Sequence, residues 1–199
     1  AASGTFGFGK EFDDYIDLDK LGGISSKGLT LHKNLGNKGV RIYETAAGIM
    51  NSIGLQNPGI EYFIKEELPF LENKKAVTIA NLGGHSVEDY IKGSEFLDKT
   101  SVPIIELNIS CPNVKEGGMA FGTNPKKACE VIEKVRKTTK KVLMVKLSPN
   151  VGDIKEFVKI AENSGADCIS LVNTFNEMAI DVDNKKAVFE NKTAGLSGP

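Results

Sequence analysis

The chain has 199 residues, of which 40% are hydrophobic and 26% are charged, and its formal net charge is -1. This composition indicates a soluble globular protein and excludes a disordered or fibrous chain. The balanced charge, with no basic stripe and no apolar run near the roughly 18 residues of a membrane helix, argues against nucleic acid or a membrane as partner.

Short apolar runs alternate with longer amphipathic stretches, a pattern typical of strand-helix-strand units. We expect six strands: a stump that ends near Ala2, and residues 23–26, 76–80, 103–109, 142–147 and 168–172. The last three are nearly continuously apolar, as expected for parallel strands that are buried on both faces. Helix starts are indicated by Ser86 with Asp89, by Asn124 before Pro125, and by Asp153 with Glu156.

Almost every predicted strand has a polar residue at its carboxyl end: Ser3, Lys27, Asn81, Asn108, Lys146, and Asn173 with Thr174. A doubly wound sheet concentrates its ligand contacts at one switch point, whereas a barrel collects them from many strand ends. The pattern therefore favours an α/β fold of the (β/α)8 TIM barrel type, in one domain over residues 1–199. A barrel typically needs about 250 residues, so we expect about six of the eight units and a C-terminally truncated chain.

Residues 178–190, "MAIDVDNKKAVFE", contain two strand-like runs around a polar turn. They predict a β-hairpin inserted after the sixth strand, a candidate lid or partner surface.

The three cysteines fit neither a disulfide framework nor a zinc site, and a reducing cytoplasm suits them best. Cys129 and Cys168 are interpreted as small buried hydrophobic residues. Cys111 differs, because in "NISCPNVKEGG" it follows a strand and precedes a Pro-Asn turn and two glycines. A thiol with an ordinary pKa near 8.5, held close to a substrate, is a candidate base or nucleophile. Neither histidine suggests a metal pair, and we predict no metal site.

Lys146 lies late in the apolar run "VLMVKL", where an unpaired charge would be costly. Two interpretations remain open: a cation beside an anionic cofactor, or a Schiff-base lysine. Lys27 is equally compatible with a solvated loop lysine. As a set, Asn51, Asn81, Asn108 and Asn173 suit the recognition of a planar ring with amide and carbonyl edges.

Taken together, several stretches resemble the dihydroorotate dehydrogenase family of flavin enzymes. They are "ASGTFG" (2–7), "SKG" (26–28), "NSIGLQNPG" (51–59), "NISCPN" (108–113), "VKLSPN" (145–150), "VNT" (172–174) and "GLSGP" (195–199). They follow the family order over the whole chain, which is more specific than any single motif.

The resemblance implies a barrel that holds FMN and converts dihydroorotate to orotate in pyrimidine biosynthesis. Cys111 would remove the C5 proton while hydride leaves C6 for the flavin. Carried over by motif, the FMN contacts are Ser3, Lys27, Gly28, Asn81, Asn108, Lys146, Val172 and Gly198. The pyrimidine contacts are Lys27, Asn51, Ser52, Ile53, Gly54, Leu55, Asn108, Asn173 and Thr174.

The pattern around Cys111 resembles the NAD-linked class 1B rather than the fumarate-linked class 1A. Class 1B implies a homodimer at the core of a heterotetramer, with a partner subunit that carries FAD and a [2Fe-2S] cluster and passes electrons to NAD. Three scattered cysteines cannot supply the four ligands of such a cluster, which places it on the partner. The family binds the FMN phosphate after strands seven and eight, so we expect these 199 residues alone not to hold FMN tightly.

Three alternatives remain: a class 1A enzyme, a Schiff-base aldolase-like barrel that uses Lys146, and a barrel without catalytic activity that binds a pyrimidine or a protein.

Overall fold

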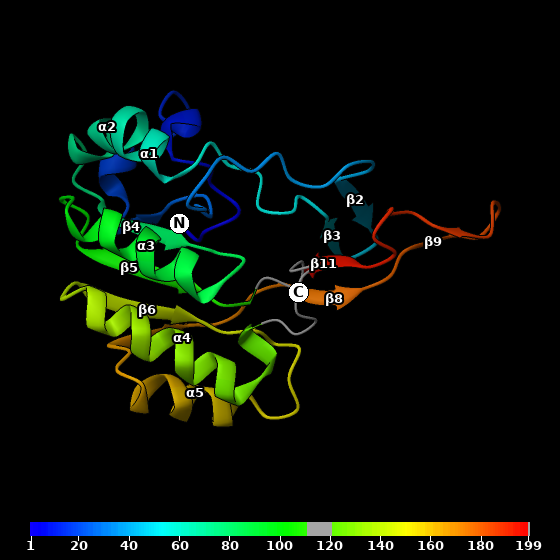
Figure 1. The fold of residues 1–199 in the computed structure, drawn as a ribbon. Helices are drawn as coiled ribbons and strands as arrows, with labels where there is room; N and C mark the ends of the chain where they lie inside the picture. The colour runs from blue at the N-terminus through cyan, green and yellow to red at the C-terminus, as the bar shows by residue number, and fades with distance from the viewer. Residues whose placement is uncertain (111–120, 199) are drawn as a thin grey trace.

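The computed structural model describes residues 1–110 and 121–198. Its main body is a five-stranded parallel sheet, drawn in Figure 1, with the order β1-β4-β5-β6-β7. The strands are β1 (Gly23–Ser25), β4 (Val77–Leu82), β5 (Ile104–Asn108), β6 (Val142–Lys146) and β7 (Cys168–Ser170).

Helices connect these strands in the way that parallel pairing requires. They are α3 (Val87–Asp98) after β4, α4 (Pro125–Thr138) after β5 and α5 (Ile154–Asn163) after β6. A continuous helical segment precedes β4 and comprises α1 (Ile60–Tyr62), the π-helical η3 (Phe63–Glu67) and α2 (Leu68–Glu72). Short 3-10 turns are η1 (Lys10–Phe12), η2 (Leu18–Lys20) and η4 (Phe121–Thr123).

The predicted capping residues explain where α3, α4 and α5 begin. Ser86 and Asp89 form a reciprocal capping box at α3, and the Asn124 side chain accepts from the Lys127 N–H at α4. Asp153 caps α5 by accepting from the Lys155 N–H, and the described contacts show no reciprocal bond from Glu156.

Strand β5 shows how the two faces of the sheet differ. Ile105 and Leu107 are fully buried in the main core, among the residues of the helices. Because side chains alternate along a strand, Glu106 and Asn108 lie on the opposite face. That face is the interior of the curved sheet, and it is unusually polar for a buried surface.

A second, antiparallel sheet has the order β2-β3-β11-β8. Its strands are β2 (Ile42–Thr45), β3 (Gly48–Asn51), β11 (Ala194–Ser197) and β8 (Phe175–Glu177). Beyond it projects a two-stranded ribbon of β9 (Ile180–Asp181) and β10 (Lys186–Ala187), at the right of Figure 1. We call residues 178–190, which contain this ribbon, the arm.

The structure corrects two expectations about strands. The stump near Ala2 is not a strand, although Ala1 exchanges two backbone hydrogen bonds with Gly23 and Ser25 at the outer edge of β1. The antiparallel sheet was not predicted, because β2 and β8 are exposed along their whole length and carry no burial alternation. The other five predicted strands all overlap observed ones, and they form the parallel sheet of an α/β fold.

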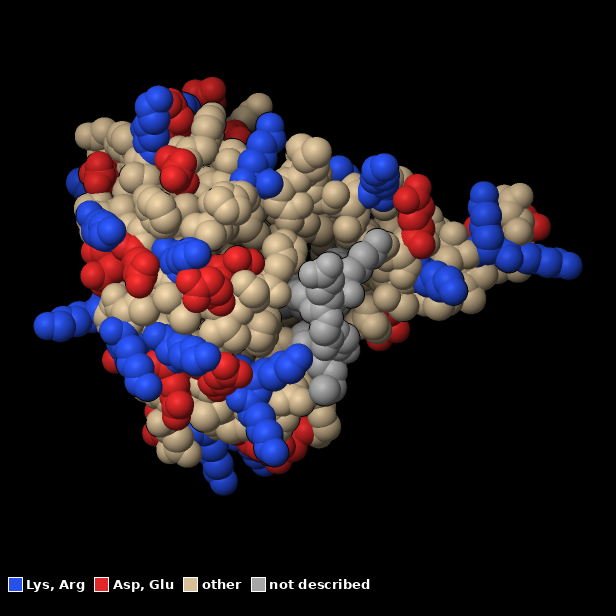
Figure 2. Space-filling model, in the orientation of Figure 1, with Lys and Arg blue, Asp and Glu red and all other residues tan. Residues whose placement is uncertain are grey.

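Positive and negative side chains are interspersed on the face of the molecule shown in Figure 2. Among the described residues, no helix combines the length and the apolar character needed to cross a membrane.

Candidate functional site

A buried carboxylate occupies the centre of the interior face of the parallel sheet. Glu106 of β5 is 4% exposed and accepts three hydrogen bonds. The Ser25 hydroxyl donates at 2.7 Å, the Asn81 amide at 2.6 Å and the Ser170 hydroxyl at 2.7 Å. These donors come from β1, β4 and β7, so one side chain connects both edges of the sheet to its middle.

The surroundings of Glu106 favour its charged form. Burial by itself raises the pKa of this carboxyl, because a charge is poorly solvated inside a protein. The hydrogen bonds from Ser170, Asn81 and Ser25, together with the positive charge of Lys146, outweigh burial and hold the pKa below its ordinary value. The carboxylate is therefore ionised near neutral pH.

Lys146 projects from β6 onto the same face. Its ammonium group donates to the Ser3 hydroxyl at 3.0 Å, and the Asn81 amide donates to the same oxygen at 3.1 Å. In the strand register Lys146 pairs with Asn108 of β5. A cation, a hydroxyl and two amides thus meet at the carboxyl ends of neighbouring strands.

Three asparagines form a chain across this end of the sheet. The Asn108 amide donates to the Asn81 side-chain oxygen at 3.4 Å, and the Asn173 amide donates to the Asn108 side-chain oxygen at 3.1 Å. The buried Tyr90 hydroxyl donates to the Asn108 backbone oxygen at 2.8 Å and so links the strand to α3. All three asparagines were singled out from the sequence as ring-binding residues.

A second group of predicted residues lies on the antiparallel sheet. The Asn51 amide donates to the Gly195 backbone oxygen at 3.3 Å, across 144 residues of chain. A Cβ atom at Gly195 would overlap the Thr174 side chain, so Thr174 packs directly on this glycine. Strand β11 therefore brings Asn51 and Thr174 together, although they are distant in sequence.

The segment between Asn51 and Leu55 is held by a preceding loop. The Asn37 amide donates to the Ser52 hydroxyl at 3.0 Å, and the Asn37 N–H donates to the Ile53 oxygen at 3.1 Å. The Asn34 amide donates to the Gly54 oxygen at 3.3 Å. These bonds fix the path of the predicted pyrimidine segment.

Asn57 supports the end of that segment, and sequence reasoning missed it. Its amide donates to the Leu55 oxygen at 2.7 Å and to the Thr30 hydroxyl at 2.8 Å. Its oxygen accepts from the Thr30 N–H at 3.1 Å and from the Gly59 N–H at 2.8 Å. Leu55 has a φ of 54°, a left-handed conformation that a branched residue adopts only when its surroundings impose it.

Leu55 reaches back to the parallel sheet. A Cβ atom at Gly28 would lie 3.0 Å from the Leu55 side chain and 3.1 Å from the Asn81 side-chain oxygen. The absence of a side chain at Gly28 thus leaves a narrow space between Leu55 and Asn81. The pyrimidine segment and the predicted cofactor residues meet at this point.

Other predicted residues stand apart from these contacts. Gly198 lies against Ala47 and Gly48, at the turn of the β2-β3 hairpin. Val172 follows β7 and is 39% exposed. The Lys27 backbone N–H donates to the Gly7 oxygen at 2.7 Å, and its ammonium group has no hydrogen-bond partner among the described residues. Cys111 lies outside the described residues.

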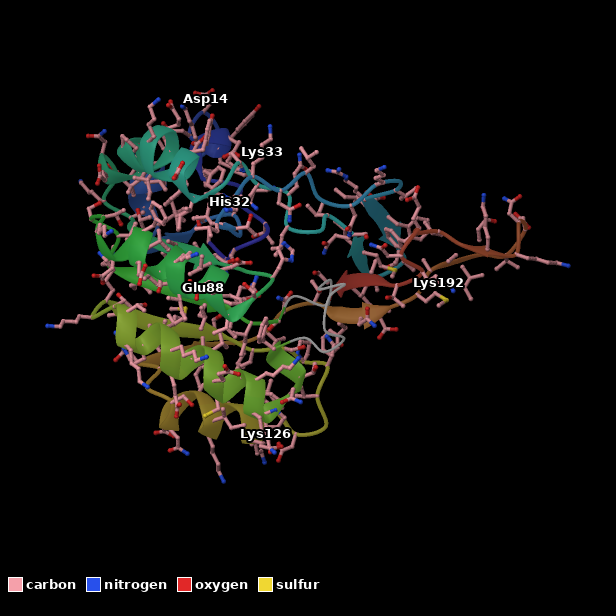
Figure 3. The ribbon with its side chains drawn as sticks, in the orientation of Figure 1. Asp14, His32, Lys33, Glu88, Lys126 and Lys192 are labelled. Carbon is pink, nitrogen blue, oxygen red and sulfur yellow. The ribbon has the colours of Figure 1, made fainter. Side chains whose placement is uncertain are left out.

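The remaining cysteines and histidines lie elsewhere. The Cys129 thiol contacts the Ser164 hydroxyl at 3.4 Å, between α4 and α5. Cys168 is half-buried in β7, and burial, followed by the charges of Asp167 and Glu106, raises the pKa of its thiol. Figure 3 places His32 beside Lys33, on the segment that leads from β1 to β2. Within residues 1–110 and 121–198, no group of three His, Cys, Asp or Glu residues is arranged to hold a metal ion.

Sequence reasoning also missed Glu106, the centre of the network. The available signal was a single acid inside the apolar run "PIIELNI". An ionised side chain in a buried parallel strand needs several partners, so such a residue marks a polar cluster.

A family model described as dihydroorotate dehydrogenase matches residues 1–199. The chain is 58% identical over 199 residues to a protein of Petrotoga mobilis, and 52% identical over 198 residues to one of Thermoanaerobacter pseudethanolicus. Both are named dihydroorotate dehydrogenase B (NAD(+)), catalytic subunit. Each alignment covers 100% of this chain and 66% of the relative, so the chain spans just under two thirds of their length.

Proposed function

Because the chain belongs to the dihydroorotate dehydrogenase family, we propose that it forms part of an enzyme that oxidises dihydroorotate to orotate with FMN. The observation that carries this proposal is the convergence of Ser3, Asn81, Asn108, Lys146 and Asn173 in one hydrogen-bonded cluster. These positions come from distant parts of the chain, and the family resemblance assigned all of them to the flavin or the pyrimidine.

The described residues fit a flavin ring. Among the described residues, the Lys146 ammonium group donates one hydrogen bond, to Ser3, which leaves further N–H groups for an anionic or carbonyl edge. Gly28 leaves open a narrow space beside the Asn81 oxygen, which a Cβ atom would fill. When bound, FMN would supply the hydride acceptor of the reaction.

Residues of this chain would stabilise charge on the ring and orient the substrate. Lys146 would stabilise negative charge that develops on the ring, because an ammonium group in a partly desolvated site is a strong electrostatic partner. Asn108 and Asn173 would orient the pyrimidine through their amides. Asn51 and Thr174, joined by Gly195, would hold its other side.

Proton abstraction is assigned to Cys111. It follows β5 by three residues, directly after the cluster that contains Asn108 and Ser110. A thiolate held beside the C5 carbon could accept its proton while C6 loses hydride, so that both C–H bonds break on one oriented ring. We also propose that the complete protein closes the barrel and binds the FMN phosphate.

The relatives are named catalytic subunits of an NAD(+) enzyme. We therefore extend the proposal to a partner subunit that carries FAD and a [2Fe-2S] cluster and delivers electrons to NAD. A cytoplasmic heterotetramer built on a homodimer is the assembly that the resemblance implies.

The decisive test measures dihydroorotate-dependent dye reduction by the full-length, FMN-loaded protein. Removing a positioned base lowers a rate by about 10²–10⁴-fold, so Cys111→Ala should lose that much activity near neutral pH. Cys111→Ser should lose most of it as well, because a hydroxyl is a far weaker acid than a thiol. Cys129→Ala is the matched control, since this thiol lies between α4 and α5, and it should retain activity.

Activity of Cys111→Ala near that of the wild type would contradict the assignment of the base. No reduction by the wild type would contradict the proposed reaction itself. Reduction of fumarate in place of NAD by the complete assembly would instead identify the class 1A alternative.

A further inference from the structure

Glu106 is not among the residues that the proposed function uses, yet it is the most buried charge in the described part of the chain. An ionised carboxylate has only acceptor sites, so every neighbour within hydrogen-bond distance must donate. Ser25 and Ser170 can do so by rotating their hydroxyls. The Asn81 amide has a donor side, its NH₂ group, and an acceptor side, its oxygen. Beside a carboxylate it must present the NH₂ group.

Both hydrogens of the Asn81 NH₂ group are then used inside the protein. One is donated to Glu106 at 2.6 Å and the other to the Ser3 hydroxyl at 3.1 Å. Ser3 also accepts from the Lys146 ammonium group at 3.0 Å. No hydrogen of the Asn81 side chain remains for a ligand.

The Asn81 side-chain oxygen consequently points away from Glu106. It accepts from the Asn108 amide at 3.4 Å, a long contact that leaves a lone pair available. The same oxygen would lie 3.1 Å from a Cβ atom at Gly28, so it borders the narrow space beside Leu55. The Ser110 backbone N–H donates to the Asn108 side-chain oxygen at 3.3 Å. That oxygen is therefore an acceptor, which leaves the Asn108 NH₂ group as the side that donates to Asn81.

From this arrangement we infer that Glu106 is a positioning residue that commits Asn81 to accept a hydrogen bond from the bound ring. The group beside Asn81 must therefore present an N–H donor, whereas the group beside Lys146 must present an acceptor. Glu106 acts here as an acceptor for the Asn81 amide and needs no contact with the ligand. The part that concerns the ring rests on the proposed function.

The test compares three variants by the side-chain amide signals of Asn81 in ¹⁵N NMR spectra of the chain without ligand. Glu106→Met removes the acceptor, and exchange of the Asn81 amide hydrogens with water should accelerate by about tenfold or more, the factor that corresponds to one lost hydrogen bond. Glu106→Gln keeps an acceptor oxygen for Asn81 and should retain both the signals and their protection. Ser170→Ala removes a different bond to the same carboxylate and should also leave the Asn81 signals in place.

Asn81→Asp assigns the signals, because it deletes the NH₂ group. Wild-type exchange rates in Glu106→Met would overturn the inference, as would a Glu106→Gln spectrum in which the Asn81 signals move or double. If Glu106→Met does not fold, the Glu106→Gln spectrum alone decides: unchanged Asn81 signals support the inference, and moved or doubled signals refute it.

Addition of FMN to the full-length protein separates this inference from the proposed function. Both amide hydrogens of Asn81 should stay protected in the complex, because the ligand binds the oxygen. FMN that loosens those hydrogens would overturn the inference. FMN that shifts no signal of the protein would count against the proposed function, while the spectra of the free chain would still decide the role of Glu106.

Discussion

The parallel and antiparallel sheets differ in how they are buried, and the difference shows where a polar site can be built. In β5 four of the five residues are buried, and the strand packs into the main core. In β2 and β8 every residue is exposed, and the small core of the antiparallel sheet consists of Met50, Phe189 and Ala194. Glu106 is buried in the parallel sheet, where three side chains donate hydrogen bonds to it.

The two regions should therefore open independently. Segments with few buried apolar contacts unfold locally at a lower free energy than core strands. The antiparallel sheet holds Asn51 and Thr174, and the parallel sheet holds Asn81, Asn108 and Lys146. The part of the candidate site on the parallel sheet is therefore expected to open at a higher free energy than the part on the antiparallel sheet.

The largest effect is expected in the main core. Leu107→Ala removes a fully buried side chain from β5 and should lower the free energy of unfolding by about 2–5 kcal/mol, measured by urea denaturation. Val182→Ala, at a residue of the arm that is 77% exposed, is the control and should change it by less than about 0.5 kcal/mol. Equal effects of the two substitutions would refute the contrast between the regions.

An intermediate loss of stability is expected at Asn57, which joins the Leu55 segment to Thr30. Asn57→Ala leaves the buried N–H groups of Thr30 and Gly59 without their acceptor, which should cost about 1–3 kcal/mol of stability. It also releases the Leu55 oxygen, so affinity for orotate, measured by calorimetry, should fall as well. Gln56→Ala, at an exposed neighbour that accepts from Arg41, should change stability by less than about 0.5 kcal/mol. A stable Asn57→Ala variant with wild-type affinity would show that the segment needs no such support.

The smallest effect concerns acid sensitivity. The pKa of Glu106 lies below its ordinary value of 4.5 in the folded protein, so its charge stabilises the fold above that pH. This contribution is lost as the pH falls through the lowered pKa. Wild type should thus be more stable than Glu106→Gln at neutral pH, and the gap should narrow in urea titrations below about pH 4.5.

The control for acid sensitivity is Glu88→Gln on the exposed surface of α3, where Figure 3 labels the residue. It removes a carboxylate whose ion pair with Lys92 is solvated, and it should change stability by less than about 1 kcal/mol. A gap between wild type and Glu106→Gln that widens in acid would contradict the stabilising role of the Glu106 charge.

The sequence predicted the parallel sheet well, because its strands are apolar runs whose residues face a core. It also identified the strand-end residues Asn81, Asn108 and Lys146, since parallel strands place their carboxyl ends on one edge. It could not predict the antiparallel sheet. Strand β3 pairs with β11 across more than 140 residues, and no local pattern encodes that pairing.

The sequence did not predict the roles of Glu106 and Asn57, for a different reason. Neither stands out in the strand or turn that contains it, because the bonds that make each residue important come from other parts of the chain. Only the folded chain shows that Glu106 receives hydrogen bonds from β1, β4 and β7. The role assigned to Cys111 stays a prediction from resemblance.

The contact between Lys146 and Ser3 has a kinetic consequence, because it joins residues 143 positions apart. During synthesis on the ribosome the Ser3 hydroxyl emerges early, and it must wait until β6 has been made before the ammonium group can reach it. Closing so long a loop is entropically slow. Local helices such as α3 are thus expected to form first, and the hydrogen-bonded cluster at the carboxyl ends of the strands to assemble among the last events of folding.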